Sequence, residues 1–106
     1  YNAAVAMFRL CLDVDTKSIA EENDIKGMLA GRLSQLFKKG LLVGELEELS
    51  HCIREQGNDG AHDGSVTLED SLDVMDFTIS YLEARYTMPE RIRIRREARQ
   101  RRHEKN

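Results

Sequence analysis

A short segment in the middle of the chain carries three side chains that could act together on a phosphate: Arg54, Asn58 and His62. If one helix runs through them, the two steps of four residues place all three within about 80° of arc. An arginine guanidinium binds phosphate through paired hydrogen bonds, an asparagine amide adds a neutral donor, and an imidazole can move a proton near neutral pH. Gly57 and Gly60 leave the neighbouring surface open to a close approach. The pattern therefore predicts ligand or phosphate binding by Arg54, Asn58 and the two glycines.

The same residues also fit a purely structural interpretation. Asparagine and glycine commonly end helices, and Asp59-Gly60 and Asp63-Gly64 are typical turn dipeptides. His62 would then only satisfy the last carbonyl groups of a helix. By spacing alone the structural interpretation is favoured, and the binding interpretation stays open beside it.

The elements that must position this segment are helices. Apolar residues recur at steps of three and four along most of the chain, and no segment finds a partner for a strand. The expected helices cover residues 2–22, 24–39, a third from about 44 into the motif, and a fourth from 67 to about 87. The sequence therefore predicts an all-α fold, a four-helix bundle with a basic helical extension at its C-terminus.

Several local features refine these helices. Asn23 or Asp24 is expected to cap the second helix, whereas Thr67, with an acidic residue three positions on, is a typical start for the fourth. Arg9 lies within the apolar stripe of the first helix, so it needs a partner, and the carboxylate of residue 13, one turn later, is the natural candidate. Pro89 either interrupts the fourth helix or lies in the first turn of a fifth.

The net charge of −3 conceals two regions of opposite sign. Residues 90–106 hold eight Lys or Arg against three Glu, a net of +5, whereas residues 1–89 hold eight against sixteen, a net of −8. We expect a helical bundle over 1–89 and a basic helix or tail over 90–106. That tail could contact nucleic acid, fold back on the acidic body or stay solvated, and the solvated end is the favoured alternative.

The composition of the chain argues against several classes of protein. With 106 residues, of which 41% are hydrophobic and 33% charged, the chain fits one folded domain. It has no apolar run of about 18 residues for a membrane span and no secretory signal pattern. Cys11 and Cys52 are too few and too isolated for a zinc site, and no cluster implies a metal or cofactor. We expect a cytoplasmic protein, and we interpret the start at Tyr1 as that of a fragment.

The segment from Arg54 to His62, written Arg-x-x-Gly-Asn-x-x-Ala-His, resembles the signature of domain-of-unknown-function family 4145, a bacterial group placed in the HEPN superfamily. The likeness also covers residues 1–9, Gly40-Leu41-Leu42 and the stretch from Asp76 to Pro89. The resemblance implies a HEPN-like helical bundle in a bacterial, defence-associated setting. It also implies a partner or fused module of the nuclease, restriction or helicase kind.

Catalytic HEPN proteins are metal-independent ribonucleases that dimerise so that two Arg–His motifs share one cleft. By that resemblance His62 would be the general acid and base for attack by an RNA 2′-OH, Arg54 would stabilise the charge developing on phosphorus, and Asn58 would position the phosphate or the imidazole. The chain departs from the pattern, because seven residues separate Arg54 from His62, a longer gap than in those nucleases, and Glu55 follows the arginine. An acidic neighbour opposes phosphate binding, which counts against cleavage.

Three functions are consistent with these residues, and whether the chain is an enzyme stays open. The favoured one is a non-catalytic interaction or regulatory module acting with a nuclease, helicase or defence system. The second is an endoribonuclease using Arg54 and His62, and the third is a sensor of a nucleotide or small ligand at the same face. RNA or a nucleotide is thus the candidate ligand. We also expect a homodimer, because the family resemblance implies one and because the first and fourth helices carry apolar residues on more than one face.

Overall fold

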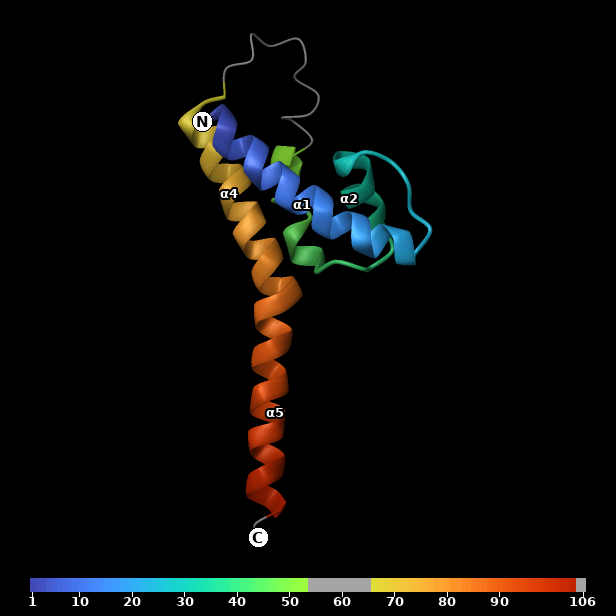
Figure 1. The fold of residues 1–106 in the computed structure, drawn as a ribbon, viewed down its shortest axis with the longest axis vertical. Coiled ribbons are helices and arrows are strands. Elements are labelled where there is room, and N and C mark those ends of the chain that lie inside the picture. Colours follow the sequence, from blue (N-terminus) through green and yellow to red (C-terminus); the bar gives the residue numbers. More distant parts are fainter. Residues whose placement is uncertain (54–65, 105–106) are drawn as a thin grey trace.

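The described part of the chain, residues 1–53 and 66–104 of the computed structural model, is built from helices and turns. In chain order the elements are α1 (Asn2–Glu22), α2 (Leu29–Lys38), the 3-10 helix η1 (Gly44–Leu46), α4 (Leu68–Leu82), the π-helical turn η2 (Glu83–Thr87) and α5 (Met88–Glu104). No strand occurs among these residues, which confirms the predicted all-α class. Figure 1 shows α1, α2 and α4 gathered in a body from which α5 projects, and the molecule measures 66 × 32 × 20 Å.

The first helix has the bounds that its periodicity predicts, and its end is closed by a recognisable motif. Asp24 follows the helix in the left-handed conformation, with φ of 54°. The next residue, Ile25, donates its N–H to the carbonyl of Ala20 at 2.9 Å and is buried beside it. This bond and this apolar contact are those of a Schellman-type helix end.

The second helix starts at Leu29, later than the predicted start near residue 24. The later start has a local cause. Asp24 forms part of the end of α1, and Gly27 has a φ of 126°, which residues with a side chain rarely adopt. Asn23, the other predicted cap, donates its side-chain amide to the carbonyl of Ile19 at 2.8 Å. The prediction that Asn23 or Asp24 caps the second helix is therefore wrong.

The third expected helix, from residue 44, is not a continuous α-helix in its described part. η1 is followed by hydrogen-bonded turns, and α-helical geometry begins only at residue 51. Most backbone bonds here span three residues, as from the N–H of Ile53 to the carbonyl of Ser50 at 3.0 Å. The N–H of Ser50 is shared between the carbonyls of Glu47 and Leu46, both at 3.1 Å. The Ser50 hydroxyl donates to the same Glu47 carbonyl, and such side-chain competition favours tight turns over an α-helix.

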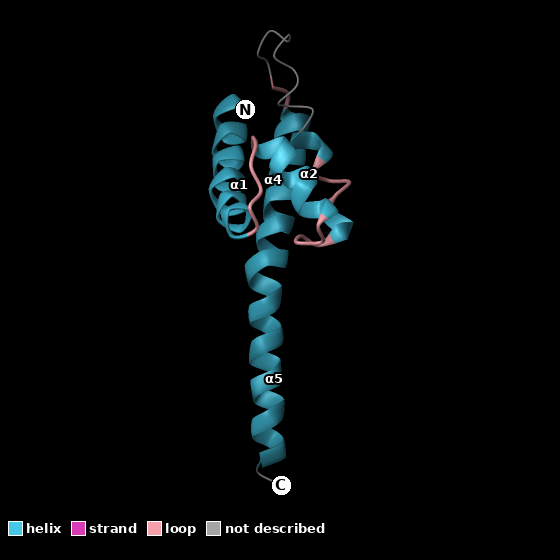
Figure 2. Ribbon diagram, turned by 90° about the vertical axis from the view of Figure 1, so that its right-hand side faces the viewer, coloured by secondary structure: helices cyan, strands magenta, loops and turns pink. Residues whose placement is uncertain are grey.

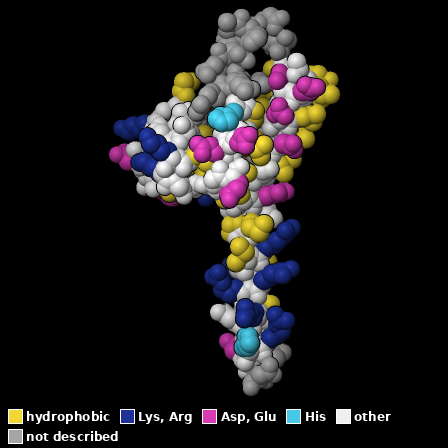
Figure 3. Space-filling view, turned by 180° about the vertical axis from the view of Figure 1, so that it is seen from behind, with side chains coloured by type: hydrophobic (Ala, Val, Ile, Leu, Met, Phe, Trp, Pro, Cys, Tyr) yellow, Lys and Arg dark blue, Asp and Glu magenta, His cyan; other side chains and the backbone are white. Residues whose placement is uncertain are grey.

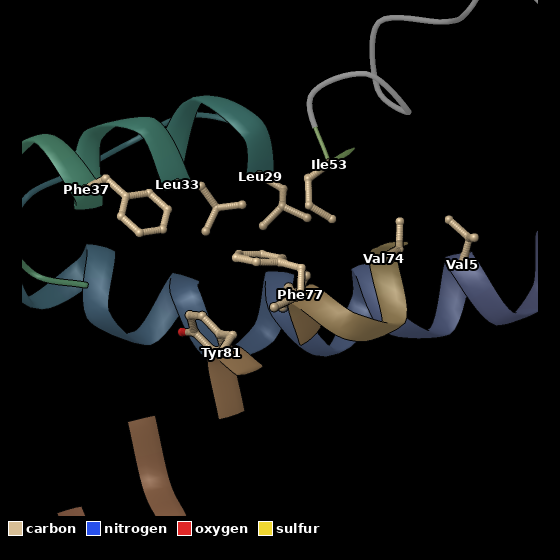
Figure 4. Packing of buried hydrophobic residues seen from close by; sticks show 9 residues of the cluster. Val5, Leu29, Leu33, Phe37, Ile53, Val74, Phe77 and Tyr81 are labelled. Carbon is tan, nitrogen blue, oxygen red and sulfur yellow. The ribbon is translucent and has the colours of Figure 1, made fainter. Parts of the chain in front are cut away.

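The main core lies where α1, α2 and α4 meet. Its buried residues are Val5, Leu12, Leu29, Leu33, Phe37, Ile53, Val74, Phe77 and Tyr81. Figure 4 shows the side chains of α2 pointing toward Phe77 and Tyr81 of α4, whose ring centroids lie 6.2 Å apart. Burying an aliphatic or aromatic side chain of this size contributes about 1.5–3 kcal/mol each, so this cluster is what holds the three helices together.

The fourth helix begins as predicted. Thr67 is its N-cap, and its hydroxyl accepts the N–H of Asp70 at 3.1 Å while the Asp70 carboxylate accepts the N–H of Thr67 at 3.1 Å. These two bonds form a capping box, which satisfies two of the donors that a helix start leaves unpaired.

Pro89 does not end the helical run. In the turned view of Figure 2, α4 continues through η2 into α5 as one line of helix, with Pro89 in the first turn of α5. Proline removes an N–H and its ring clashes with the carbonyl four residues earlier. The π turn just before it is wider, and the N–H of Met88 bonds to the carbonyl of Glu83, five residues back. None of the described helices is long and apolar enough to cross a membrane.

Candidate functional site

The residues singled out by the motif lie outside the described residues: Arg54, Gly57, Asn58, Gly60 and His62. The residues on either side of that segment are described. Ile53 is fully buried, and its carbonyl accepts a hydrogen bond from the Arg9 guanidinium at 2.9 Å. The N–H of Val66 donates to the side-chain oxygen of Asn2 at 3.2 Å. Both flanks of the motif are thus bound by side chains from the first half of α1.

The predicted pair of Arg9 with Asp13 is wrong. Arg9 donates a hydrogen bond to the carbonyl of Ile53, whereas the Asp13 carboxylate accepts a hydrogen bond from Arg32 Nη1 at 2.7 Å. The reason is burial, because the side chain of Arg32 is 7% exposed and a buried guanidinium needs a nearby negative charge more than a surface one does.

Arg32 joins α1 to the segment before α2. Besides Asp13, its guanidinium donates to the hydroxyl of Thr16 at 3.1 Å and to the carbonyl of Gly27 at 3.0 Å. Thr16 is itself buried and donates its hydroxyl to the carbonyl of Leu12 at 2.7 Å. Both terminal nitrogens of this guanidinium, Nη1 and Nη2, are therefore bonded within the fold, which makes Arg32 a structural centre.

A second polar centre surrounds Asp15, on the side of α1 that faces α4 and η2. Its carboxylate accepts hydrogen bonds from the hydroxyls of Tyr81 and Tyr86 and, at 2.7 Å, from Nε of Arg85. Burial opposes the charge of Asp15, but the three donors outweigh it, so the pKa of Asp15 lies below its ordinary value. Burial and the hydrogen bond to Asp15 raise the pKa of Tyr81.

The π turn η2 explains how these donors converge. η2 begins two residues after Tyr81, and its wider turn carries Arg85 and Tyr86, so that both tyrosines and Arg85 reach the same carboxylate. No motif in the sequence pointed to this centre, because Asp15 and its three donors are 66 to 71 residues apart along the chain. A carboxylate held by three donors and a lowered pKa is poorly suited to accept a proton at neutral pH, so the centre fixes α1 against η2.

One side of α1 carries an exposed apolar stripe. Met7, Leu10 and Val14 are 67%, 57% and 64% exposed and follow one another at steps of three and four residues. Together with Cys11 and Leu82 they line a shallow groove of about 530 Å³. Leu10 also borders a second groove, of about 780 Å³, on the α2 side. Contiguous apolar surface of this kind commonly marks an interaction site.

A family model described as a domain of unknown function (DUF4145) matches residues 1–101. The chain belongs to this family. The membership predicted from the motif is therefore confirmed, and the match runs from α1 into the last turns of α5. No curated protein and no solved structure matches the chain.

Three features of this DUF4145 domain could therefore bear function. They are the motif, whose residues lie outside the described part, the apolar stripe on α1, and the exposed helix α5. Within residues 1–53 and 66–104 no group of three His, Cys, Asp or Glu side chains is placed to hold a metal ion. The described arrangement offers surfaces for binding, and its two polar centres, around Arg32 and Asp15, stabilise the fold.

Proposed function

We propose that this DUF4145 domain is a HEPN-like, non-catalytic interaction module that works as a homodimer beside a nuclease, helicase or defence protein in the bacterial cytoplasm. In this proposal residues 1–89 form the HEPN-like four-helix bundle and residues 90–106 form a basic extension. The observation that carries the proposal is the apolar stripe on α1, since α1 buries one side in the core and leaves Met7, Leu10 and Val14 in solvent.

A two-fold homodimer suits a stripe on a straight helix. In such a dimer the same patch meets itself, so apolar surface on one copy covers apolar surface on the other. The stripe lies on a rigid part of the fold, because Asp15 and Thr16, which follow it directly, are bound to η2 and to α2. Little ordering would be needed on association, which lowers the entropic cost of binding.

The position of the motif flanks favours a non-catalytic module over a composite nuclease. Asn2 and Arg9, which bind the two flanks, are seven residues apart and so share one side of α1. At about 100° per residue that side lies roughly 110–130° around the helix from the apolar stripe. A dimer formed through the stripe would therefore hold the flanks away from its two-fold axis, whereas HEPN nucleases need two motifs in one cleft.

The dimer is tested by sedimentation of the wild type and of a Leu10→Glu variant, with Leu49→Glu as the matched control. Leu49 is 48% exposed and lies outside α1, so its charge should leave the interface intact. We expect dimers for the wild type and Leu49→Glu, and a folded monomer for Leu10→Glu. A wild type that stays monomeric at high concentration would contradict the proposal.

The two alternatives keep the motif as the working site. In the first, an endoribonuclease, His62 is the general acid and base, Arg54 stabilises the developing charge and Asn58 positions the phosphate. In the second, a nucleotide or small-ligand sensor, the arginine and asparagine bind the ligand beside Gly57 and Gly60. RNA cleavage is measured without added metal for the wild type and for His62→Ala. We expect no cleavage from either protein. Products with 2′,3′-cyclic phosphate ends that vanish in the variant would establish the nuclease instead.

A further inference from the structure

The helix α5 contains no buried residue. It projects from the body in Figure 1 and packs against the adjoining turn η2. Within Met88–Glu104 it holds seven arginines, no lysine and three glutamates, a net of +4. In Figure 3 basic side chains line the projecting helix while acidic side chains gather over the body. Such a helix adds little to the core, so its charges are available to a partner.

The charges on α5 are sorted by side. Glu90, Glu97 and Glu104 follow one another at steps of seven residues, which places them within about 40° of arc. Arg93 lies on the same side and binds two of them, Glu97 through Nη1 at 2.8 Å and Glu90 through Nε at 3.1 Å. The acidic side of the helix therefore already contains its own counter-charge.

The opposite side is purely basic. Arg91, Arg95, Arg99 and Arg102 fall within about 80° of arc and extend about 16 Å along the axis. None of the four forms an ion pair with any residue of the described ranges. We call these four residues the arginine face. Ala98 lies beside it and borders a shallow depression of about 650 Å³ that leaves room for a chain to approach; the other lining residues are Arg95, Arg101, Arg102 and Glu104.

We propose that the arginine face of α5 binds the phosphodiester backbone of a nucleic acid, without reading its sequence. Arginine is always charged and its planar fork matches a phosphate with paired hydrogen bonds. A row of four such forks suits a partner whose negative charges repeat along a line, as the phosphates of a strand do. The acidic body, with a net of −8 over residues 1–89, repels the same polyanion, so contact is confined to α5.

A membrane surface fits this helix poorly. Binding in the plane of a membrane requires an apolar side opposite the charged one. The two isoleucines of α5, Ile92 and Ile94, are separated by about 160° around the axis and form no common side. Electrostatic contact with phosphates needs no such apolar side, which favours the nucleic acid.

The test measures binding of the full chain to three fluorescent oligonucleotides of mixed sequence: duplex DNA, duplex RNA and single-stranded RNA. Four phosphate contacts predict that log K falls against log salt with a slope of about −3.6 for duplex DNA and about −2.8 for a single strand. Replacing all four face arginines by glutamine, which keeps helix propensity, should abolish measurable binding while circular dichroism stays unchanged. Comparing the three oligonucleotides shows which nucleic acid is preferred.

A matched pair of single variants locates the contact on the helix. Arg95→Gln and Arg93→Gln change the net charge equally, but Arg95 belongs to the arginine face and Arg93 is bound to glutamates. We expect Arg95→Gln to reduce the steepness of the salt slope by about 1 and Arg93→Gln to leave it unchanged. Equal slopes in the two variants would overturn the face assignment. A wild type that binds none of the three oligonucleotides would overturn the proposal. This holds whether or not the glutamine variant also changes self-association.

Discussion

The body and the projecting helix use their charges in opposite ways. In the body, Asp15 and Arg32 are each held by three or more hydrogen bonds from other segments of the chain. Among the arginines of α5, only Arg93 is bound to other side chains of the described residues, and its partners Glu90 and Glu97 lie about one turn away on the same helix. Paired charge in the body positions helices, whereas unpaired charge on α5 is left for contacts outside the chain.

The two regions meet at the Asp15 centre. Tyr81 belongs to α4, and Arg85 and Tyr86 belong to η2, so one carboxylate on α1 binds the point at which α4 passes into α5. The direction in which α5 leaves the body is therefore set by a polar centre of the body. The following substitutions test how far this division between body and helix holds.

The largest loss should come from the core. Phe77, on α4, is fully buried in the main core. Phe77→Ala should reduce the free energy of unfolding by about 3–5 kcal/mol. Urea unfolding followed by circular dichroism measures it. The control is Ile92→Ala on α5, where the side chain is 49% exposed and the urea midpoint should not move. Similar losses at the two positions would contradict the division between body and helix.

A smaller loss is expected at Arg32. Arg32→Ala removes the hydrogen bonds to Asp13, Thr16 and Gly27 and should reduce the free energy of unfolding by about 2–3 kcal/mol. Arg32→Lys should restore only part of it, because an ammonium group cannot reach these acceptors as a planar fork does. Full stability in the lysine variant would show that charge alone matters at this position.

Local signals in the sequence predicted much of the body. The bounds of α1 follow from periodicity, and the Thr67–Asp70 capping box follows from spacing, since both depend on neighbours within a few residues. The start of α2 and the 3-10 turn at residue 44 were missed, because backbone conformation at Asp24 and Gly27 and the Ser50 hydroxyl override the apolar pattern.

The polar centres could not be predicted from local signals. Asp15 meets Arg85 across 70 residues of chain, and the meeting depends on a π turn that no pattern in a single sequence indicates. The burial of Arg32 likewise depends on how α1 and α2 pack. The motif from Arg54 to His62 lies outside the described residues, so its role as a binding site stays a prediction.

Asp15→Asn should cost less than the loss of Arg32. The asparagine keeps the shape, but the hydroxyls of Tyr81 and Tyr86 and the Arg85 guanidinium lose a charged acceptor, so we expect a loss of about 1–2 kcal/mol in urea unfolding. The same change at Asp73, which is exposed on α4, is the control. No difference between the two variants would mean that Asp15 does not fix η2.

The same centre predicts a pH dependence. Because the pKa of Asp15 is lowered in the folded state, its stabilisation is complete above the ordinary value of 3.8 and is lost as pH falls below it through the lowered pKa. The wild type should therefore lose more stability than Asp15→Asn does as the pH falls below 3.8. The free energy of unfolding is measured by urea titration at each pH. An equal decrease with falling pH in the wild type and in Asp15→Asn would contradict the role of the Asp15 carboxylate.

The smallest effect on stability should come from removing the extension. A chain ending at Pro89 lacks residues 90–106, none of whose described members is buried, so its urea midpoint should match that of the full chain. Helical ellipticity should fall because the turns of α5 are gone, and nucleic-acid binding should vanish with the arginine face. A clear loss of stability would show that α5 packs on the body in solution. An unchanged midpoint means that the fold does not need this helix, so its sorted charges require an explanation outside the chain.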